Sequence, residues 1–346
     1  MSGARRPDRV GLYRKMLACR RLEEAIAGLW HEGRISGEMH LGIGEEGINA
    51  GVLDHLVEGD AVALDHRGTA GMLLRGVDPA ALVAECLGAP AGLCGGAGGH
   101  MHLFSKEHLA ASSGIVGSSG PAACGFAYAA QLLRPGRVAV AFFGEAAMNQ
   151  GMLMEALNLA TVWELPVLFV CRDNGMAIAT PSASMTGGDL LDRARGLGVP
   201  AESVDGSEVE SVWRAAGRSL ERARRGRGPG FLHATCVRPE GHFLGDPLVR
   251  IARRPVVELR ERAGPLAAAA TSTAGASLTA RAANLRRIGA AMGRAAWSQI
   301  GPGRDPLARL RPRVALSADA LAALEREVER EVAGAVERAL GSEPAS

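Results

Sequence analysis

Two short polar segments each follow an apolar run and carry side chains that can bind a metal ion. Glu145 follows VAVAFF (138–143), and Asn174 follows VLFVC (167–171). Ligands of parallel sheets bind outside the carboxyl ends of the strands, so we expect both side chains at one sheet edge. One carboxylate and one amide oxygen suit a hard cation that also takes phosphate oxygens. The pattern therefore predicts Mg²⁺ held together with a diphosphate.

The main-chain carbonyl of Met176 is a third candidate ligand of this ion. A helix that starts near residue 149 directs the positive end of its dipole at the same edge, which also favours an anion. The alternative is that Glu145 and Asn174 only cap helices and turns. Spacing alone does not separate the two interpretations.

The elements that position these side chains alternate between strand and helix. Continuous apolar runs predict strands buried on both faces, and apolar residues at helical spacing predict the helices between them. The predicted strands are 61–64, 138–143, 167–171 and 231–236, and the predicted helices are 8–32, 46–57, 79–87, 121–133, 150–163 and 208–225. This order indicates an α/β protein with a doubly wound, mostly parallel sheet flanked by helices.

The last hundred residues have a different character. We assign 1–250 to the α/β domain and 251–346 to a helical C-terminal region. Within it, the low-complexity segment 264–280 predicts a loop or linker. Helices are expected at 280–298 and 317–340.

Composition excludes several classes of protein. Of 346 residues, 47% are hydrophobic and 22% are charged, and the net charge is +2, so neither nucleic acid nor a membrane surface is an expected partner. Six cysteines without CxxC spacing indicate a reducing compartment rather than a zinc site or a disulfide framework. The N-terminus has no apolar core like that of a signal peptide, and no apolar run of about 18 residues occurs, so we expect a cytoplasmic protein.

The longest motif joins the two polar segments. The stretch GEAAMNQGMLMEALNLATVWELPVLFVCRDNGMAIAT resembles the thiamine diphosphate signature of the alpha subunits of 2-oxo acid and acetoin dehydrogenases. Further blocks resemble this family in order and spacing, namely MHLGIGEEG (39–47), DHRGTAG (65–71), GGAGGHMH (95–102), SGIVGSSGPAACGFAYA (113–129) and RPEGHFLGDP (238–247). The resemblance covers roughly 10–250 and resumes at 305–330, after an apparent insertion. It implies the thiamine-diphosphate-binding fold.

The resemblance also implies a role for each matching residue. Glu145, Asn174 and the Met176 carbonyl are expected to hold Mg²⁺. The expected contacts to thiamine diphosphate come from His66, Arg67, Gly114, Val116, Gly144, Glu145, Ala146, Asn174, Arg238 and His242. The histidines expected near the reacting atoms are His40, His102 and His242. For each isolated histidine or arginine, a structural or solvated role is the alternative.

The implied protein is an oxidoreductase that works as part of an assembly. The family implies a heterotetramer of two alpha and two beta chains, with the cofactor at the alpha–beta interface. The glutamate that activates the aminopyrimidine is expected from the beta subunit. Glu45 and Glu46 are expected to be helix N-terminal residues instead. The substrate is expected to be a 2-oxo acid or acetoin, and the acyl unit to pass to a lipoyl transacylase.

The chain also departs from the family pattern. Glu145 replaces Asp, Ala146 replaces Gly and Asp173 replaces Asn in the signature. Thr69 stands where many members have a second active-site histidine, and Ala97 replaces a basic residue. Phe243 replaces the serine that kinases phosphorylate in mitochondrial relatives. A biosynthetic relative that transfers a ketol or glycolyl unit is one alternative function, and a degenerate, non-catalytic assembly subunit is another.

Two further motifs match patterns that belong to other functions. The segment Gly42–Gly47 matches GxGxxG, but SGEMH precedes it instead of an apolar strand, so a dinucleotide site is rejected. The run ERARRGRG (221–228) matches a basic nucleic-acid-binding segment, but it is interpreted as a helix C-terminus, where the helix dipole favours arginine side chains and glycine caps the helix.

Overall fold

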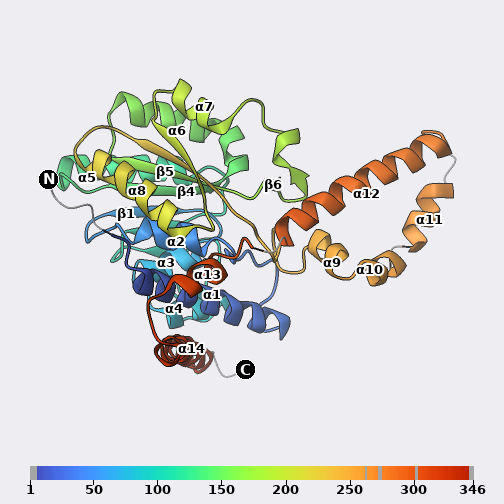
Figure 1. Cartoon of the computed structure of the whole chain (residues 1–346), viewed down its shortest axis with the longest axis horizontal. Coiled ribbons are helices and arrows are strands. Elements are labelled where there is room, and N and C mark those ends of the chain that lie inside the picture. Colours follow the sequence, from blue (N-terminus) through green and yellow to red (C-terminus); the bar gives the residue numbers. More distant parts are fainter. Residues whose placement is uncertain (1–5, 262, 272–274, 301–302, 343–346) are drawn as a thin grey trace.

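The computed structural model describes residues 6–261, 263–271, 275–300 and 303–342 and is built on a seven-stranded sheet (Figure 1). The strand order is β2-β3-β1-β4-β5-β9-β8, and only the pair β2 and β3 is antiparallel. The strands are β1 (Ala61–Leu64), β2 (Phe104–Ser105), β3 (Ala110–Ser112), β4 (Ala139–Gly144), β5 (Val167–Asp173), β8 (Ala201–Asp205) and β9 (Gly230–Thr235). The predicted mostly parallel α/β sheet is confirmed.

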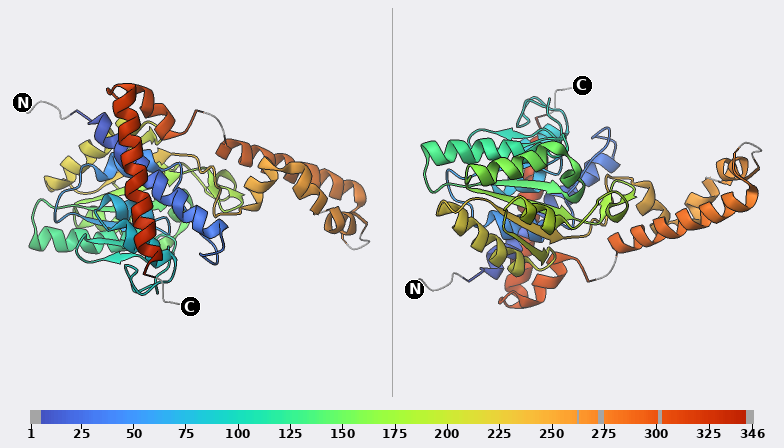
Figure 2. Two further views of the ribbon diagram at one scale, coloured as in Figure 1. Left: turned by 90° about the horizontal axis from the view of Figure 1, so that it is seen from below. Right: turned by 90° about the horizontal axis from the view of Figure 1, so that it is seen from above.

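Helices cover both faces of the sheet (Figures 1 and 2). One face packs against α1 (Arg9–His31), α2 (Glu46–Leu53), α3 (Thr69–Leu74), α4 (Pro79–Cys86) and α8 (Val209–Arg224). The other face packs against α5 (Ser119–Leu133), α6 (Gly151–Val162) and α7 (Leu190–Gly196). The sheet is therefore doubly wound, as the alternation of strands and helices predicts.

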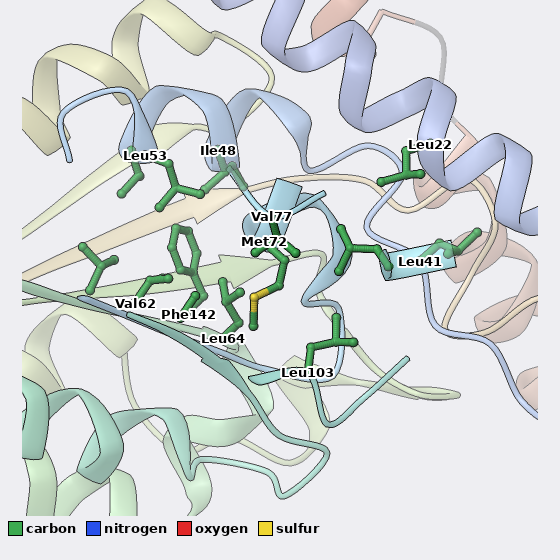
Figure 3. Packing of buried hydrophobic residues seen from close by; sticks show 14 of the residues in the cluster. Leu22, Leu41, Ile48, Leu53, Val62, Leu64, Met72, Val77, Leu103 and Phe142 are labelled. Atoms are coloured by element: carbon green, nitrogen blue, oxygen red, sulfur yellow. The ribbon is translucent and has the colours of Figure 1, made fainter. Parts of the chain in front are cut away.

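Strand β4 shows why the apolar runs are continuous. Successive side chains point to opposite faces of a sheet, so Val140 and Phe142 join the cluster with α1 and α2, whereas Ala141 and Phe143 join the cluster with α5 and α6. Figure 3 shows Phe142 packed among the buried residues of the first cluster. A strand covered on both faces has no solvent side, so every position is apolar.

Some short elements were not predicted. Strand β8 lies at the sheet edge and has mostly half-exposed or exposed side chains, so its sequence AESVD contains no apolar run. Strands β2 and β3 lie between residues 104 and 112, where no strand was predicted. Helix α2 ends at Leu53, earlier than the predicted residue 57. A 3₁₀ turn, Glu145–Asn149, precedes α6.

The C-terminal helices return to the main body. After α13 (Pro306–Leu310), the long helix α14 (Ala318–Leu340) begins at Ser317, whose hydroxyl accepts a hydrogen bond from the Ala320 N–H. Helix α14 crosses α1 (Figure 2), and the Tyr13 hydroxyl donates to Glu325 Oε1 at 2.7 Å. The predicted helix at 317–340 is thus confirmed, while the division of the chain at residue 250 stays a prediction.

The described residues between 247 and 300 form a helical arm that projects from the sheet domain (Figures 1 and 2). It contains α9 (Pro247–Arg253), α10 (Pro255–Glu261), α11 (Ala263–Thr271) and α12 (Leu278–Ile300). The prediction of a loop over 264–280 is wrong for its first half, because α11 is helical there. Its sequence AGPLAAAAT is rich in alanine, the residue with the highest helix propensity. Residues 272–274 lie outside the described residues.

Two sequence expectations concern the surroundings of the protein. All six cysteines are free thiols, and only Cys94 is not buried. Among the described residues, no helix combines the length and apolar character needed to span a membrane. The expected compartment stays a prediction.

We predict that Phe142→Ala destabilises the chain by about 3–5 kcal/mol, because the ring is fully buried and its loss leaves a cavity in the sheet core. The free energy of urea-induced unfolding measures this change. Phe104→Ala is the matched control, because the Phe104 ring is 59% exposed. Equal unfolding free energies for the two variants would contradict the packing shown here.

Candidate active site

A cavity of about 340 Å³ opens at the carboxyl ends of β1, β4 and β5. Most of the predicted site residues line it, namely His40, His66, Gly114, Val116, Gly144, Glu145, Ala146, Met176, Arg238 and His242. They come from segments spread over some two hundred positions of the sequence. The structure thus brings the separate motifs to one place, at the sheet edge where ligands of parallel sheets bind.

Glu145 begins the 3₁₀ turn directly after β4 and is 2% exposed. Its Oε1 accepts a hydrogen bond of 2.5 Å from the Ser182 hydroxyl, which fixes the orientation of the carboxyl group. Burial raises the pKa of Glu145, and the nearby Arg238 guanidinium opposes this rise. A divalent cation bound here would favour the ionised form of the same group.

Asn174 follows β5 at the same sheet edge as Glu145. Gly144 and Arg172 are register partners in β4 and β5, so the two strands end side by side. Asn174 Oδ1 accepts a hydrogen bond of 3.0 Å from Arg238 Nη1, and Arg238 also attracts the Glu145 carboxylate. The two predicted ligand residues therefore converge on one arginine. Their role as metal ligands stays a prediction.

Arg67 is a fully buried cation behind the cavity. Its guanidinium donates to the main-chain oxygens of Leu41 and His242, both at 2.6 Å. Among the described residues, no carboxylate accepts a hydrogen bond from it, and its Nε has no partner. Burial and the neighbouring Arg238 lower the pKa of Arg67 to about 9. Such a cation favours an anionic ligand.

Three histidines, His40, His66 and His242, gather at this cavity. One ring nitrogen of each lies within 4.8 Å of the others. Burial, with Arg67 as a neighbouring positive charge, lowers the pKa of each ring to about 3, so all three are neutral at pH 7. The spacing suits a metal ion, but the arginines beside the rings repel a cation and attract an anion. We therefore interpret the cluster as part of an anion site.

A buried ionic network supports these groups from behind. Glu45 Oε1 pairs with Arg238 Nε at 2.6 Å, and Glu45 Oε2 pairs with Arg172 Nη1 at 2.8 Å. Arg172 also pairs with Asp65 Oδ1 at 2.5 Å. Burial raises the pKa of Glu45, but Arg172 and Arg238 more than offset this effect and lower it. The carboxylate is therefore ionised at neutral pH.

Other predicted residues lie at the rim or away from the cavity. His102 is exposed, with its ring beside Gly114. Thr69 points elsewhere, because its hydroxyl donates to the buried Glu23. The Phe243 ring packs near His40, at 6.1 Å between ring centroids. Glu45 and Glu46 stand at the start of α2, as predicted, although both are fully buried.

Sequence reasoning missed several residues. No role was predicted for His100 in the glycine-rich segment 95–102, but its side chain is 9% exposed and contacts His40. Glu45 was expected only to be a helix N-terminal residue that the helix dipole stabilises, and its two ion pairs were not predicted. Asp65 precedes the His66–Arg67 pair, and this adjacency was a usable signal. The sequence around Ser182 contains no motif that predicts its contact with Glu145. Ser182 reaches the site because it follows a small two-stranded turn, β6 (Met176–Ala177) and β7 (Thr180–Pro181).

The segment Gly42–Gly47, which matches GxGxxG, has a structural role. Gly44 adopts a φ of +98°, and a Cβ atom there would lie 2.1 Å from the Val237 carbonyl oxygen. The glycine therefore allows the start of α2 to approach the segment that carries Arg238. In the part of the chain that the structure describes, the segment between α1 and α2 contains no strand, whereas a dinucleotide-binding turn follows one.

Comparisons with known proteins show which family this chain is similar to. The model of the dehydrogenase E1 component family matches residues 14–277. The alpha subunit of acetoin:2,6-dichlorophenolindophenol oxidoreductase from Cupriavidus necator is 43% identical over 237 residues, which are 68% of this chain and 71% of that protein. Its counterpart from Bacillus subtilis is 40% identical over equal shares. The pyruvate dehydrogenase E1 component subunit alpha from Zymomonas mobilis is 37% identical over 76% of this chain and 75% of that protein.

The chain therefore belongs to the dehydrogenase E1 component family. Its class is that of the thiamine-diphosphate-dependent oxidoreductases that act on 2-oxo acids or acetoin, and its relatives are alpha subunits. The fold and function predicted from the sequence motifs are thus confirmed at this level.

We predict that Glu45→Gln destabilises the chain by about 3–5 kcal/mol at pH 7, because it leaves two buried arginines without their shared carboxylate. The folded-state pKa of Glu45 is lowered, so its contribution is present above the unfolded pKa of about 4.3 and is lost as pH falls through the folded value. The difference from wild type should therefore shrink in acid.

Urea-induced unfolding at several pH values between neutrality and about 3.5 measures this difference. Glu32→Gln is the control, because Glu32 is exposed just after α1 and its change should stay within about 0.5 kcal/mol. A Glu45→Gln variant as stable as wild type at pH 7 would show that the network does not support the site.

Proposed function

We propose that this chain is the alpha subunit that binds thiamine diphosphate and Mg²⁺ in this cavity and, with a beta subunit, cleaves acetoin or a 2-oxo acid. The proposal rests on the buried guanidinium group of Arg67. No carboxylate of the described residues accepts a hydrogen bond from this group, and it lies behind a cavity that Glu145 lines. A cation on one side and a carboxylate on the other suit a diphosphate bridged to a metal ion.

The side chains present fit the cofactor and the ion. Glu145, Asn174 and the Met176 carbonyl would hold Mg²⁺, which prefers oxygen ligands. The guanidinium groups of Arg67 and Arg238 would neutralise the diphosphate. The His66 Nε2 atom is buried without a partner, so it would complete its hydrogen bonding with a phosphate oxygen. The main-chain groups of Gly114 and Val116 would meet the aminopyrimidine ring.

The residues of this chain then have distinct tasks. The bound cofactor supplies the carbon nucleophile and accepts the electrons of the cleaved carbon–carbon bond. The chain itself binds the negative charge through Arg67 and Arg238 and excludes water by burial. The neutral rings of His40 and His242 can accept or return a proton at the substrate oxygen. The exposed His102 at the rim would contact the substrate as it enters.

A beta subunit is the proposed partner that closes the cavity. Large apolar side chains surround its mouth while remaining solvent-exposed, namely Ile115, Val116, Ile178 and Met185. Apolar surface of this kind around a pocket favours a protein contact. We propose a heterotetramer of two alpha and two beta chains, with a lipoyl transacylase as the acceptor of the acyl unit.

The rival functions differ in what a co-expressed alpha–beta complex does. The proposed dehydrogenase, supplied with thiamine diphosphate and Mg²⁺, reduces dichlorophenolindophenol in the presence of acetoin or pyruvate. A ketol-transferring relative leaves the dye oxidised and transfers a carbon unit to a carrier protein. A non-catalytic subunit does not bind thiamine diphosphate even with the beta chain present. The first outcome supports the proposal, and either of the others overturns it.

We predict that Glu145→Ala abolishes Mg²⁺-dependent thiamine diphosphate binding, because it removes the only charged ligand proposed for the ion. Glu145→Asp keeps the carboxylate and should retain binding, weakened about 10- to 100-fold because the shorter side chain loses its hydrogen bond to Ser182. Isothermal titration of the alpha–beta complex with the cofactor, with and without Mg²⁺, measures both effects.

Glu155→Ala is the matched control for this titration. Glu155 lies on α6 and lines a different surface hollow, so its loss should leave cofactor affinity unchanged. If Glu145→Ala binds the cofactor with the affinity of wild type and the same dependence on Mg²⁺, the metal-ligand assignment is wrong.

A further inference from the structure

Two histidines from different loops meet at the wall of the cavity. His40 lies between α1 and α2, and His100 lies in the glycine-rich loop between α4 and β2. Their side chains are 6% and 9% exposed. His40 lines the cavity, while His100 stands behind it. His100 is therefore placed to act on His40 rather than on a ligand.

One nitrogen of His100 receives two contacts from His40. The main-chain N–H of His40 donates to His100 Nε2 at 3.2 Å, and His40 Nδ1 lies 3.0 Å from the same atom. A main-chain N–H is always a donor, so His100 Nε2 must carry a lone pair and the proton of His100 must sit on Nδ1. Two lone pairs would repel at 3.0 Å, so His40 Nδ1 must carry a proton.

The hydrogen-bond network thus assigns a tautomer to His40. Burial and the positive charge of Arg67 keep the pKa of His40 at about 3, and burial keeps that of His100 at about 4, so both rings are neutral at pH 7. A neutral imidazole holds only one proton. With that proton on Nδ1, His40 Nε2 carries the free lone pair.

The other ionisable groups around His40 do not supply an alternative acceptor. Arg67 donates to main-chain oxygens, and Asp65 pairs with Arg172. His66 and His242 meet the His40 ring edge to face, at 4.9 Å between centroids. Among the described residues, the nitrogen of His100 is thus the one acceptor recorded for His40 Nδ1.

We propose that His100 is a positioning residue that fixes the tautomer of His40, so that Nε2 is ready to accept a proton from a substrate hydroxyl. This inference rests on the proposed function. When His40 Nε2 takes that proton, its Nδ1–H becomes a charge-assisted donor to His100, which stabilises the imidazolium. His100 orients the base and does not touch the substrate.

The test compares two substitutions of His100 in the alpha–beta complex. His100→Leu removes the acceptor, and His100→Gln keeps a carbonyl oxygen at a similar distance along the side chain. We expect kcat for acetoin-dependent dye reduction to fall about 10- to 100-fold in the leucine variant, because the base is left without a fixed tautomer. The kcat of the glutamine variant should be about tenfold higher than that of the leucine variant.

His31→Gln is the control, because His31 lies at the end of α1 and does not line the cavity. It should leave kcat unchanged. A purely structural role predicts instead that the leucine and glutamine variants lose the same share of kcat. Equal losses, or no loss in the leucine variant, would overturn the proposal.

A spectroscopic measurement reads the tautomer without any activity. Two-bond ¹H–¹⁵N correlations in the histidine-labelled full-length chain identify the protonated nitrogen of His40, with the signal assigned by its absence in His40→Gln. We expect Nδ1–H in wild type and a mixture of tautomers in His100→Leu. A wild-type His40 protonated on Nε2 would refute the proposal. Failure of wild type to bind thiamine diphosphate would instead refute the proposed function, and this spectrum still decides the tautomer.

Discussion

The shared carboxylate of Glu45 ties together the three segments that build the site. Glu45 directly precedes α2, and its carboxylate pairs with Arg172 on β5 and with Arg238 just beyond β9. Two buried guanidinium groups on adjacent strand ends would repel each other without it. Because Arg238 reaches on to Asn174 and attracts Glu145, this one anion sets the geometry of the ligand-binding edge. The parallel sheet brings the strand ends to one edge, and the ionic network fixes the positions of the side chains at that edge.

Positive and negative side chains in this region are arranged in order of distance from the cavity. Glu45 and Asp65 neutralise Arg172 and Arg238 at the back, whereas Arg67 is held by carbonyl oxygens and keeps its charge for a ligand. The cavity in front is lined by neutral histidines, because burial and then the neighbouring arginines lower the pKa of their rings. This order suits an anionic cofactor that lies deep and a substrate that reacts nearer the mouth.

Much of the site was predictable because its motifs lie next to strand ends. Glu145, Asn174 and Met176 follow apolar runs, and any parallel sheet brings such segments to one edge. His100 was not predictable, because a glycine-rich sequence is typical of an exposed loop and nothing local shows that the loop folds over His40. The alanine-rich helix α11 was misassigned as a loop for a related reason. Low complexity suggests a linker, but alanine also favours helix.

The sequence by itself determined the class of fold, the family and the sheet edge at which the candidate site residues gather, because apolar periodicity and motif order are local properties of the chain. Only the tertiary structure decided which charges pair, where the edge strand β8 lies, and which nitrogen of His40 carries its proton. Those outcomes depend on contacts between segments far apart in the sequence, such as Glu45 with Arg238 and His40 with His100. Burial and hydrogen bonding at such contacts arise only when the chain has folded.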